Sequence, residues 1–210
     1  MRIIEVISTI FPEVKVIKYG RFPDGRGFFA ESFRKSDIIK EIPEIANLEI
    51  LQSNVSYSLA GVIRGLHFQW KPDMGKFVRV INGAIIDLFL DIRKNSPTFG
   101  KIDGIKIESD PEKIDDLMIW IPPGFAHGLV ILKNSYVEYF CTAEYSQTNE
   151  AGISPLSSDI DWSLCSQELK TEFDKLAKNA ILSEKDKNGF TVEGWKNDSR
   201  AENFWLKKCE

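Results

Sequence analysis

Short β-type runs, separated by Gly, Pro and Asn, fill most of the first 145 residues and constrain the fold more than any other feature. Residues 101–109 alternate imperfectly between apolar and polar positions, and two further apolar runs, 128–132 and 136–142, follow a Pro-Pro-Gly turn at 122–124. Many short strands at this spacing are typical of two packed sheets. The sequence therefore predicts an all-β fold of the sandwich or jelly-roll class.

One segment of this region predicts a specific turn. Over residues 76–92 two apolar runs flank Asn82-Gly83, the dipeptide that most readily supplies the positive φ angles of a type I′ β-hairpin. Alternation along a strand would place Lys76 on the face of Val78, and Tyr139 on the face of Val137. Both polar side chains are then candidates for the mouth of a barrel, although an exposed lysine and a core tyrosine are the simpler interpretation of each alone.

Two segments have helical patterns. Residues 36–42 predict a short helix with Ser36 as its cap and an end near Pro43. Residues 166–180 place apolar side chains at helical intervals, which predicts an amphipathic helix docked on the β core. The expected organisation is a jelly-roll domain over 1–164, followed by a helix and tail over 165–210 that pack on it.

Composition excludes several classes of protein. The 210 residues include 31 acidic and 27 basic side chains, for a formal net charge of −4. Such a chain lacks the positive field that drives nucleic-acid binding, and no run of 18 apolar residues predicts a membrane span. Three cysteines, Cys141, Cys165 and Cys209, form neither a disulfide framework nor a CxxC pair, so a reducing cytoplasm is expected.

The two histidines are the first candidates for chemistry. His67 and His127 each lie in a Gly-flanked segment, RGLHFQ and PPGFAHG, and histidine titrates near neutral pH. A structural role in the core or at its rim is the alternative. With two histidines a three-histidine metal site is impossible, but a site of two histidines and one carboxylate stays open.

A second candidate segment is DGRGFFAESF at 24–33, which carries Arg26, Phe29 and Glu31 beside glycines. An arginine on such a bend can bind phosphate and an aromatic ring can stack on a base, although an ordinary turn with a solvated arginine is the simpler interpretation of this segment alone. Its GxG is no dinucleotide-binding fingerprint, because no third glycine and no helix start follow.

Taken together, these segments resemble the dTDP-4-dehydrorhamnose 3,5-epimerase family. The resemblance runs in order through DGRGFFAESF, QSN at 52–54, RGLHFQ, the run from Met74 to Gly100, IWIPPGFAHG, YFCTAEYS, IDW and LSEKD. It implies a jelly-roll cupin that works as an isomerase on a nucleotide-linked sugar, without metal or cofactor. It also implies a homodimer in which an amino-terminal strand joins the other subunit's sheet.

The resemblance assigns roles to individual positions. It implies His67 as the general base, Asp186 as its carboxylate partner, Tyr139 as the acid on the opposite face and Lys76 beside the sugar carbonyl. The implied substrate contacts are Arg26, Phe29, Glu31, Gln52, Asn54, Arg64, His127, Tyr145, Glu150 and Lys185.

The implied reaction suits these residue types. A ketone at C4 acidifies the C–H bonds at C3 and C5, so a neutral imidazole can remove a proton if the enolate oxygen is stabilised. Epimerisation of dTDP-4-dehydro-6-deoxy-D-glucose at both carbons is the leading hypothesis. The alternatives are an epimerase of C3 only or C5 only, one for a GDP- or CDP-linked sugar, a metal-dependent cupin and a non-catalytic sugar-binding cupin.

Overall fold

The computed structural model describes residues 1–206, so the end of the predicted tail, with Cys209, lies outside the described residues. Its strands are β1 (Ile3–Ser8), β2 (Lys15–Gly20), β3 (Phe22–Asp24), β4 (Gly27–Phe29), β5 (Gln52–Ser58), β6 (Ile63–Gln69), β7 (Lys76–Asp91), β8 (Ile102–Ser109), β9 (Asp115–Ile121), β10 (Phe125–Cys141) and β11 (Glu150–Gly152). The helices are α1 (Lys35–Glu41), α2 (Gln167–Ala177), α3 (Glu184–Lys187) and α4 (Val192–Lys196), with 3-10 turns η1 (Pro43–Ile45), η2 (Gln147–Asn149) and η3 (Ser199–Asn203).

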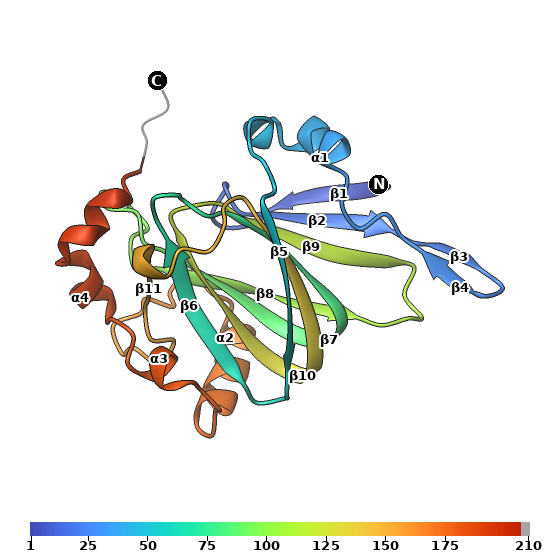
Figure 1. The fold of residues 1–210 in the computed structure, drawn as a ribbon. Helices are drawn as coiled ribbons and strands as arrows, with labels where there is room; N and C mark the ends of the chain where they lie inside the picture. The colour runs from blue at the N-terminus through green and yellow to red at the C-terminus, as the bar shows by residue number, and fades with distance from the viewer. Residues whose placement is uncertain (207–210) are drawn as a thin grey trace.

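Two long strands, β7 and β10, build both layers of a sandwich (Figure 1). They pair antiparallel along their whole length. The start of β7 and the end of β10 lie in a first layer with β1, β2, β9 and β5, and their other halves lie in a second layer with β8, β6 and β11. The prediction of a jelly-roll sandwich with short C-terminal helices is confirmed.

The predicted hairpin at Asn82-Gly83 is wrong, because β7 continues through this dipeptide. Gly83 has a φ of +107°, but it serves a bend at which β7 passes from one layer to the other. A Cβ at this position would lie 2.2 Å from Ser135 Oγ on β10, so glycine allows the two strands to bend side by side. For the same reason residues 128–132 and 136–142 are one strand, β10, and not two.

Three apolar clusters hold the layers and their coverings. The interior between the layers includes Val78 and Val137 from the first layer and Phe89 and Leu129 from the second. The outer side of the second layer is covered by the C-terminal segment, with Trp195 fully buried. The outer side of the first layer is covered in part by α1 and η1. The core therefore extends on both sides of the sheets.

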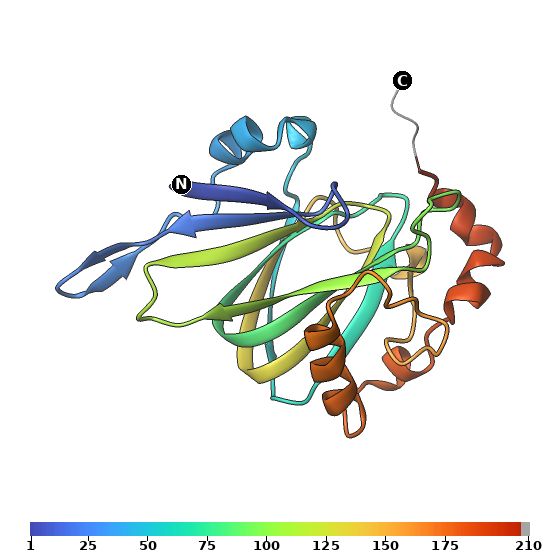
Figure 2. The ribbon, with the colours of Figure 1, turned by 180° about the vertical axis from the view of Figure 1, so that it is seen from behind.

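The predicted helix at 166–180 is confirmed as α2, with Ser166 Oγ accepting a hydrogen bond from the Leu169 amide and Phe173 buried. Figure 2 shows α2 and the other C-terminal helices on the side of the second layer. The short helix near residue 36 is also present as α1, but it begins one residue before Ser36, and its cap position, Arg34, makes no side-chain capping bond.

The hairpin of β3 and β4 projects from the body of the molecule, beyond the end of β2 (Figures 1 and 2). β3 and β4 pair only with each other among the described strands. At the base of this hairpin, Arg21 is buried and bonds the carboxylate of Asp116 at 2.7 and 2.8 Å. The base of the hairpin is therefore anchored while its tip is free of the sandwich.

Candidate active site

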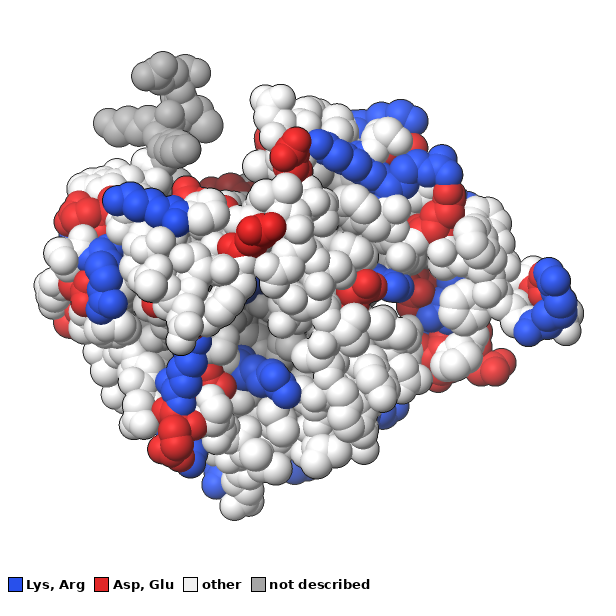
Figure 3. Space-filling view, viewed as in Figure 1, with Lys and Arg blue, Asp and Glu red and all other residues white. Residues whose placement is uncertain are grey.

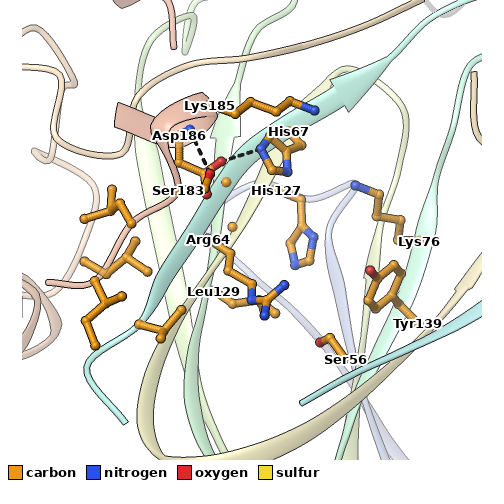
Figure 4. Close-up of a pocket in the computed structure, with 16 residues that line it drawn as sticks. Ser56, Arg64, His67, Lys76, His127, Leu129, Tyr139, Ser183, Lys185 and Asp186 are labelled. Atoms are coloured by element: carbon orange, nitrogen blue, oxygen red, sulfur yellow. Dashed lines mark hydrogen bonds and ion pairs between the residues drawn. The ribbon is translucent and has the colours of Figure 1, made fainter. Parts of the chain in front are cut away.

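A cavity of about 510 Å³ lies between the layers, with His67, Lys76, His127 and Tyr139 on its walls (Figure 4). An adjoining hollow of about 330 Å³ shares His67, Lys76 and Tyr139 with it. The remaining lining residues of the cavity are Ser56, Val62, Ile63, Arg64, Gly65, Gly128, Leu129, Ile181, Leu182, Ser183, Lys185 and Asp186. Both histidines of the sequence therefore face one space.

His67 and Asp186 form a close pair at the top of this cavity as drawn in Figure 4. The Nε2 atom of His67 lies 2.6 Å from Oδ1 of Asp186, a residue 119 positions later in the chain. Burial alone would raise the pKa of Asp186, but the bond and charge of His67, with a bond from Ser183, hold it below its ordinary value. An ionised Asp186 accepts a hydrogen bond from the Nε2–H group of His67, so Nδ1 carries no proton and faces the cavity as an acceptor.

The C-terminal segment delivers Asp186 through local and tertiary bonds. Ser183 caps α3, and its Oγ accepts a hydrogen bond from the Asp186 amide at 3.1 Å. The Ile63 amide donates to the Ile181 carbonyl, and the Ser154 amide donates to the Phe190 carbonyl. The chain is therefore tied to the sandwich on both sides of Asp186.

Lys76 and Tyr139 lie together on the wall opposite His67. In the β7–β10 register Lys76 pairs with Cys141 and Val78 pairs with Tyr139, so the predicted faces are confirmed. Burial lowers the pKa of Lys76 from its ordinary value, while Cys141, Asp87 and Glu150 partly oppose this effect. Burial raises the pKa of Tyr139, which keeps its hydroxyl protonated.

His127 has a carboxylate of its own, which the sequence analysis missed. Its Nε2 lies 3.1 Å from the carboxylate of Asp87, a fully buried residue on β7. The available signal in the sequence was Asp87 itself, a single acid within the apolar run 84–90. A carboxylate buried in such a strand needs a polar partner, so its position indicated a contact with another polar side chain. Asp87 holds His127 with one ring nitrogen engaged and the other facing the cavity.

Arg64 faces the cavity with His67 although the two are three residues apart on β6. In a regular strand they would point to opposite sides. The register of β6 against β10 shifts here, with His67 opposite His127 and Arg64 opposite Leu129. Gly65 has a φ of +110°, and a Cβ on it would lie 2.6 Å from Gly128 Cα. Two glycines therefore permit the irregularity that turns both side chains inward.

A polar rim surrounds the adjoining hollow. Glu150 Oε1 accepts hydrogen bonds from Lys185 at 2.6 Å and from the Tyr145 hydroxyl at 2.5 Å. Gln52 donates to Asn54 at 2.9 Å and accepts from the Tyr145 amide at 2.8 Å. These five residues, all predicted substrate contacts, join three separate parts of the chain at one opening.

Arg26, Phe29 and Glu31 are not brought to this cavity within the chain. Arg26 lies at the tip of the β3–β4 hairpin, is 90% exposed and pairs with Asp24 at 2.7 Å. The ring of Phe29 is also exposed. Glu31 bonds the amino group of Met1 at 2.8 Å and contacts Arg34. The predicted contacts therefore divide into a set that lines the cavity and a set that lies apart from it.

The sequence left a site of two histidines and one carboxylate open for a metal, and it predicted no membrane span. Within residues 1–206 no group of three or more His, Cys, Asp or Glu side chains is arranged to hold a metal ion. Across the same residues, every helix is too short or too polar to cross a bilayer.

The two-layered sandwich with titratable side chains around an internal cavity has the architecture of the cupin-like proteins. A family model described as dTDP-4-dehydrorhamnose 3,5-epimerase matches residues 8–193. The chain belongs to the dTDP-4-dehydrorhamnose 3,5-epimerase family, and it is an isomerase-class enzyme.

Individual relatives agree with this assignment. The dTDP-4-dehydrorhamnose 3,5-epimerase of Shigella flexneri is 37% identical over 188 residues, which cover 88% of this chain and 93% of the relative. A crystal structure of dTDP-6-deoxy-D-glucose-3,5-epimerase from Legionella pneumophila, in complex with dTDP-4-keto-L-rhamnose, is 32% identical with a TM-score of 0.79 and covers 98% of this chain and 99% of its own. The epimerase from Sulfolobus tokodaii is 38% identical with a TM-score of 0.73, covering 92% and 97%.

Proposed function

We propose that this protein epimerises dTDP-4-dehydro-6-deoxy-D-glucose at C3 and C5, giving dTDP-4-dehydro-L-rhamnose. The observation that carries the proposal is the His67–Asp186 pair facing Lys76 and Tyr139 across one cavity. These four groups supply a base, a carboxylate that orients it, a cation for an enolate oxygen and an acid on the other side. The names of the relatives support the substrate.

Proton removal is the first step. With Asp186 on Nε2, the free Nδ1 of His67 takes the proton from C3 or C5, and the electron pair of the broken C–H bond moves onto the C4 oxygen. Lys76 stabilises this enolate oxygen by donating a hydrogen bond from its ammonium group. Partial burial strengthens that interaction, because the local dielectric constant is lower than in water.

Proton return from the opposite face completes the inversion. Tyr139 donates its hydroxyl proton to the carbon, and the enolate electrons re-form the C4 carbonyl and the new C–H bond. Burial holds the pKa of Tyr139 above its ordinary value, so the proton is present at neutral pH. The proton on His67 then passes back to the tyrosinate through solvent, which resets both groups for the second carbon. The side chains supply every group these steps need, so we propose that no cofactor takes part.

The remaining cavity residues are proposed substrate contacts. Arg64 and Lys185 bring cations that suit a diphosphate, and Tyr145 brings a ring that can stack on a base. Gln52, Asn54, His127 and Glu150 bring hydrogen-bonding groups at the same opening. Lys185 pairs with Glu150 in the free protein, so an anionic substrate that binds Lys185 would replace Glu150 as its partner.

We infer that the enzyme is a homodimer in which the β3–β4 hairpin serves the neighbouring subunit. The hairpin exposes Phe28 and Phe29, and Figure 3 shows it protruding with charged side chains at its tip. The middle of the face drawn in Figure 3 is largely uncharged, and Val55 and Tyr57 are exposed on β5. Exposed apolar surface of this kind suits a second copy, which would bring Arg26, Phe29 and Glu31 to the cavity.

We also propose a cytoplasmic location. Cys141 and Cys165 are free thiols in the described chain, as is usual in a reducing compartment. The division into a jelly-roll unit over 1–164 and a helical segment that supplies Asp186 remains part of this proposal, with the two packed as one body.

The direct test is to incubate the metal-free protein with dTDP-4-dehydro-6-deoxy-D-glucose in D₂O and to follow the mass and proton spectrum of the sugar. Two deuterons, at C3 and C5, are expected for the wild type, and His67→Ala should lose nearly all exchange while still binding dTDP. A single deuteron would mark an epimerase of one carbon. No exchange would overturn the proposed reaction and direct attention to GDP- and CDP-linked sugars.

A further inference from the structure

The inner face of β5 presents a row of polar side chains to the interior of the sandwich. Gln52, Asn54, Ser56 and Ser58 alternate along this face, opposite Cys141, Tyr139, Val137 and Ser135 of β10. Gln52 and Asn54 have hydrogen-bond partners within the chain. The hydroxyl oxygens of Ser56 and Ser58 are buried and have none among the described residues.

A buried hydroxyl without a partner is unusual, because burying a polar group costs free energy unless a hydrogen bond replaces its contact with water. Two such groups on one strand invite different explanations. Ser58 is 4% exposed and sits beside Ser135 away from the cavity lining, so it is a feature of the core. Ser56 lines the cavity, and Figure 4 shows it on the side of Tyr139, across from Arg64.

The position of Ser56 relative to Tyr139 limits what it can touch. Asn54 lies directly opposite Tyr139 in the register and Ser56 opposite Val137, so Ser56 and Tyr139 are diagonal neighbours on one face. Diagonal neighbours stand about 7–8 Å apart at their backbones, a span that one hexose ring covers. A sugar held with a carbon at Tyr139 would therefore reach the side chain of Ser56, whose buried hydroxyl turns toward the sugar by rotation about χ1.

We propose that Ser56 is a specificity residue whose hydroxyl binds an oxygen substituent of the sugar ring. This inference rests on the proposed function, and it adds a contact that the motif comparison did not include. A serine hydroxyl donates one hydrogen bond and accepts others, as a sugar hydroxyl does, so the two are matched partners. The orphaned group in the free protein then finds its partner in the complex.

A phosphate oxygen is the other ligand that could reach a serine hydroxyl. The observations favour the sugar, because the cations suited to a diphosphate, Arg64 and Lys185, lie on other elements, whereas Ser56 lies on the wall that carries Lys76 and Tyr139. The two sources differ in one measurable way. A sugar contact affects only the complete nucleotide sugar, whereas a phosphate contact affects dTDP as well.

The test compares Ser56→Ala with Ser58→Ala, a matched control that removes the second orphaned hydroxyl of the same strand. Exchange in D₂O with dTDP-4-dehydro-6-deoxy-D-glucose gives kcat/KM, titration calorimetry gives the affinity for dTDP, and thermal unfolding gives Tm. Neither change breaks a hydrogen bond within the chain, so both variants should unfold within about 3 °C of the wild type.

The expected result is that Ser56→Ala lowers kcat/KM about tenfold, which is the effect of one lost hydrogen bond. The affinity for dTDP should stay within about twofold of the wild-type value. Ser58→Ala should leave both quantities within about twofold. Equal kcat/KM for the two variants would overturn the inference while leaving the proposed function intact. A parallel loss of dTDP affinity in Ser56→Ala would assign the hydroxyl to the diphosphate instead. A wild type that exchanges no protons would overturn the proposed function and this inference with it.

Discussion

Two segments that lie far from His67 in the sequence carry predicted site residues, and they behave differently. The C-terminal segment crosses the outer side of the second layer and places Asp186 against His67. The β3–β4 hairpin carries Arg26 and Phe29 away from the cavity of its own chain. Both have the residues that the family resemblance implies, so motif content does not explain the difference.

Apolar burial explains it. Trp195 is fully buried and packs edge-to-face against Phe68 of β6 with 4.6 Å between ring centroids, and Phe204 packs beside it. The rings of the hairpin contact the guanidinium groups of Arg2 and Arg21 and one another but join none of the apolar clusters, and Phe29 is 66% exposed. A segment docks where burial of apolar area outweighs the entropy lost on ordering it. The hairpin needs a surface that the single chain does not offer.

The largest expected effect breaks the anchoring of the C-terminal segment. Trp195→Ala should lower the free energy of unfolding by about 3–5 kcal/mol, because it removes a large side chain from a packed cluster. Phe29→Ser in the hairpin should lower it clearly less, because Phe29 is 66% exposed in its own chain and only its contact with a neighbouring subunit would be lost. Urea denaturation of both variants measures the contrast, and similar losses would contradict it.

A change at the catalytic end of the same segment should affect turnover rather than folding. Asp186→Asn keeps the shape of the side chain but removes the charge that orients His67, so kcat should fall about 100- to 1000-fold. Lys187→Gln is the control, because Lys187 lies on the same short helix but pairs with Glu184 at the surface. Deuterium exchange rates of the two purified variants check this, and a fully active Asp186→Asn would remove the carboxylate from the proposed mechanism.

Mixed dimers sharpen the comparison from the side of the hairpin. Homodimers of Arg26→Ala and of His67→Ala should each lose most activity. In a mixed dimer, the cavity of the Arg26→Ala chain keeps its own His67 and receives the intact hairpin of the His67→Ala chain, so that one cavity has neither defect. Random assembly then restores about a quarter of the wild-type rate, because half of the dimers are mixed and half of their sites are intact.

The control for this experiment is a mixture of His67→Ala with Lys76→Met. Both residues line the same cavity of one chain, so every cavity keeps a defect and no recovery is expected. Activity is measured per subunit on the whole, unfractionated dimer population after co-expression of the two chains. Absence of recovery in the Arg26→Ala mixture would show that the hairpin does not serve the neighbouring subunit.

The smallest expected effect concerns pH. The folded-state pKa of Asp186 lies below its ordinary value, so its pairing stabilises the fold at pH values above the unfolded pKa of about 3.9 and is lost as the pH falls through the folded value. In Asp186→Asn this part of the acid dependence should disappear. Its stability should therefore fall less steeply between about pH 5 and pH 2, by an amount on the order of 1 kcal/mol. Identical acid profiles for wild type and variant would contradict this.

Local pattern indicated part of the site, and the family resemblance supplied the roles of its residues. Alternation along two strands placed Lys76 and Tyr139 on matching faces, and the β7–β10 register brings them together. The same kind of reasoning failed at Asn82-Gly83, where a turn dipeptide serves a bend between layers. A dipeptide specifies allowed φ angles, but whether the chain reverses there depends on which strand lies beside it.

The sequence by itself determined the strand composition of the fold, the order of its motifs, the two histidines and the polar residue types around them. Only the tertiary structure decided that Arg64 shares a face with His67 and that Asp87 holds His127. It also places Asp186, which the family resemblance implied as the partner of His67, 2.6 Å from that histidine across 119 residues. The physical reason is the range of the forces involved. Alternation and capping act between near neighbours in the chain, whereas a β irregularity, a buried carboxylate and a docked segment exist only where distant parts of the chain pack together.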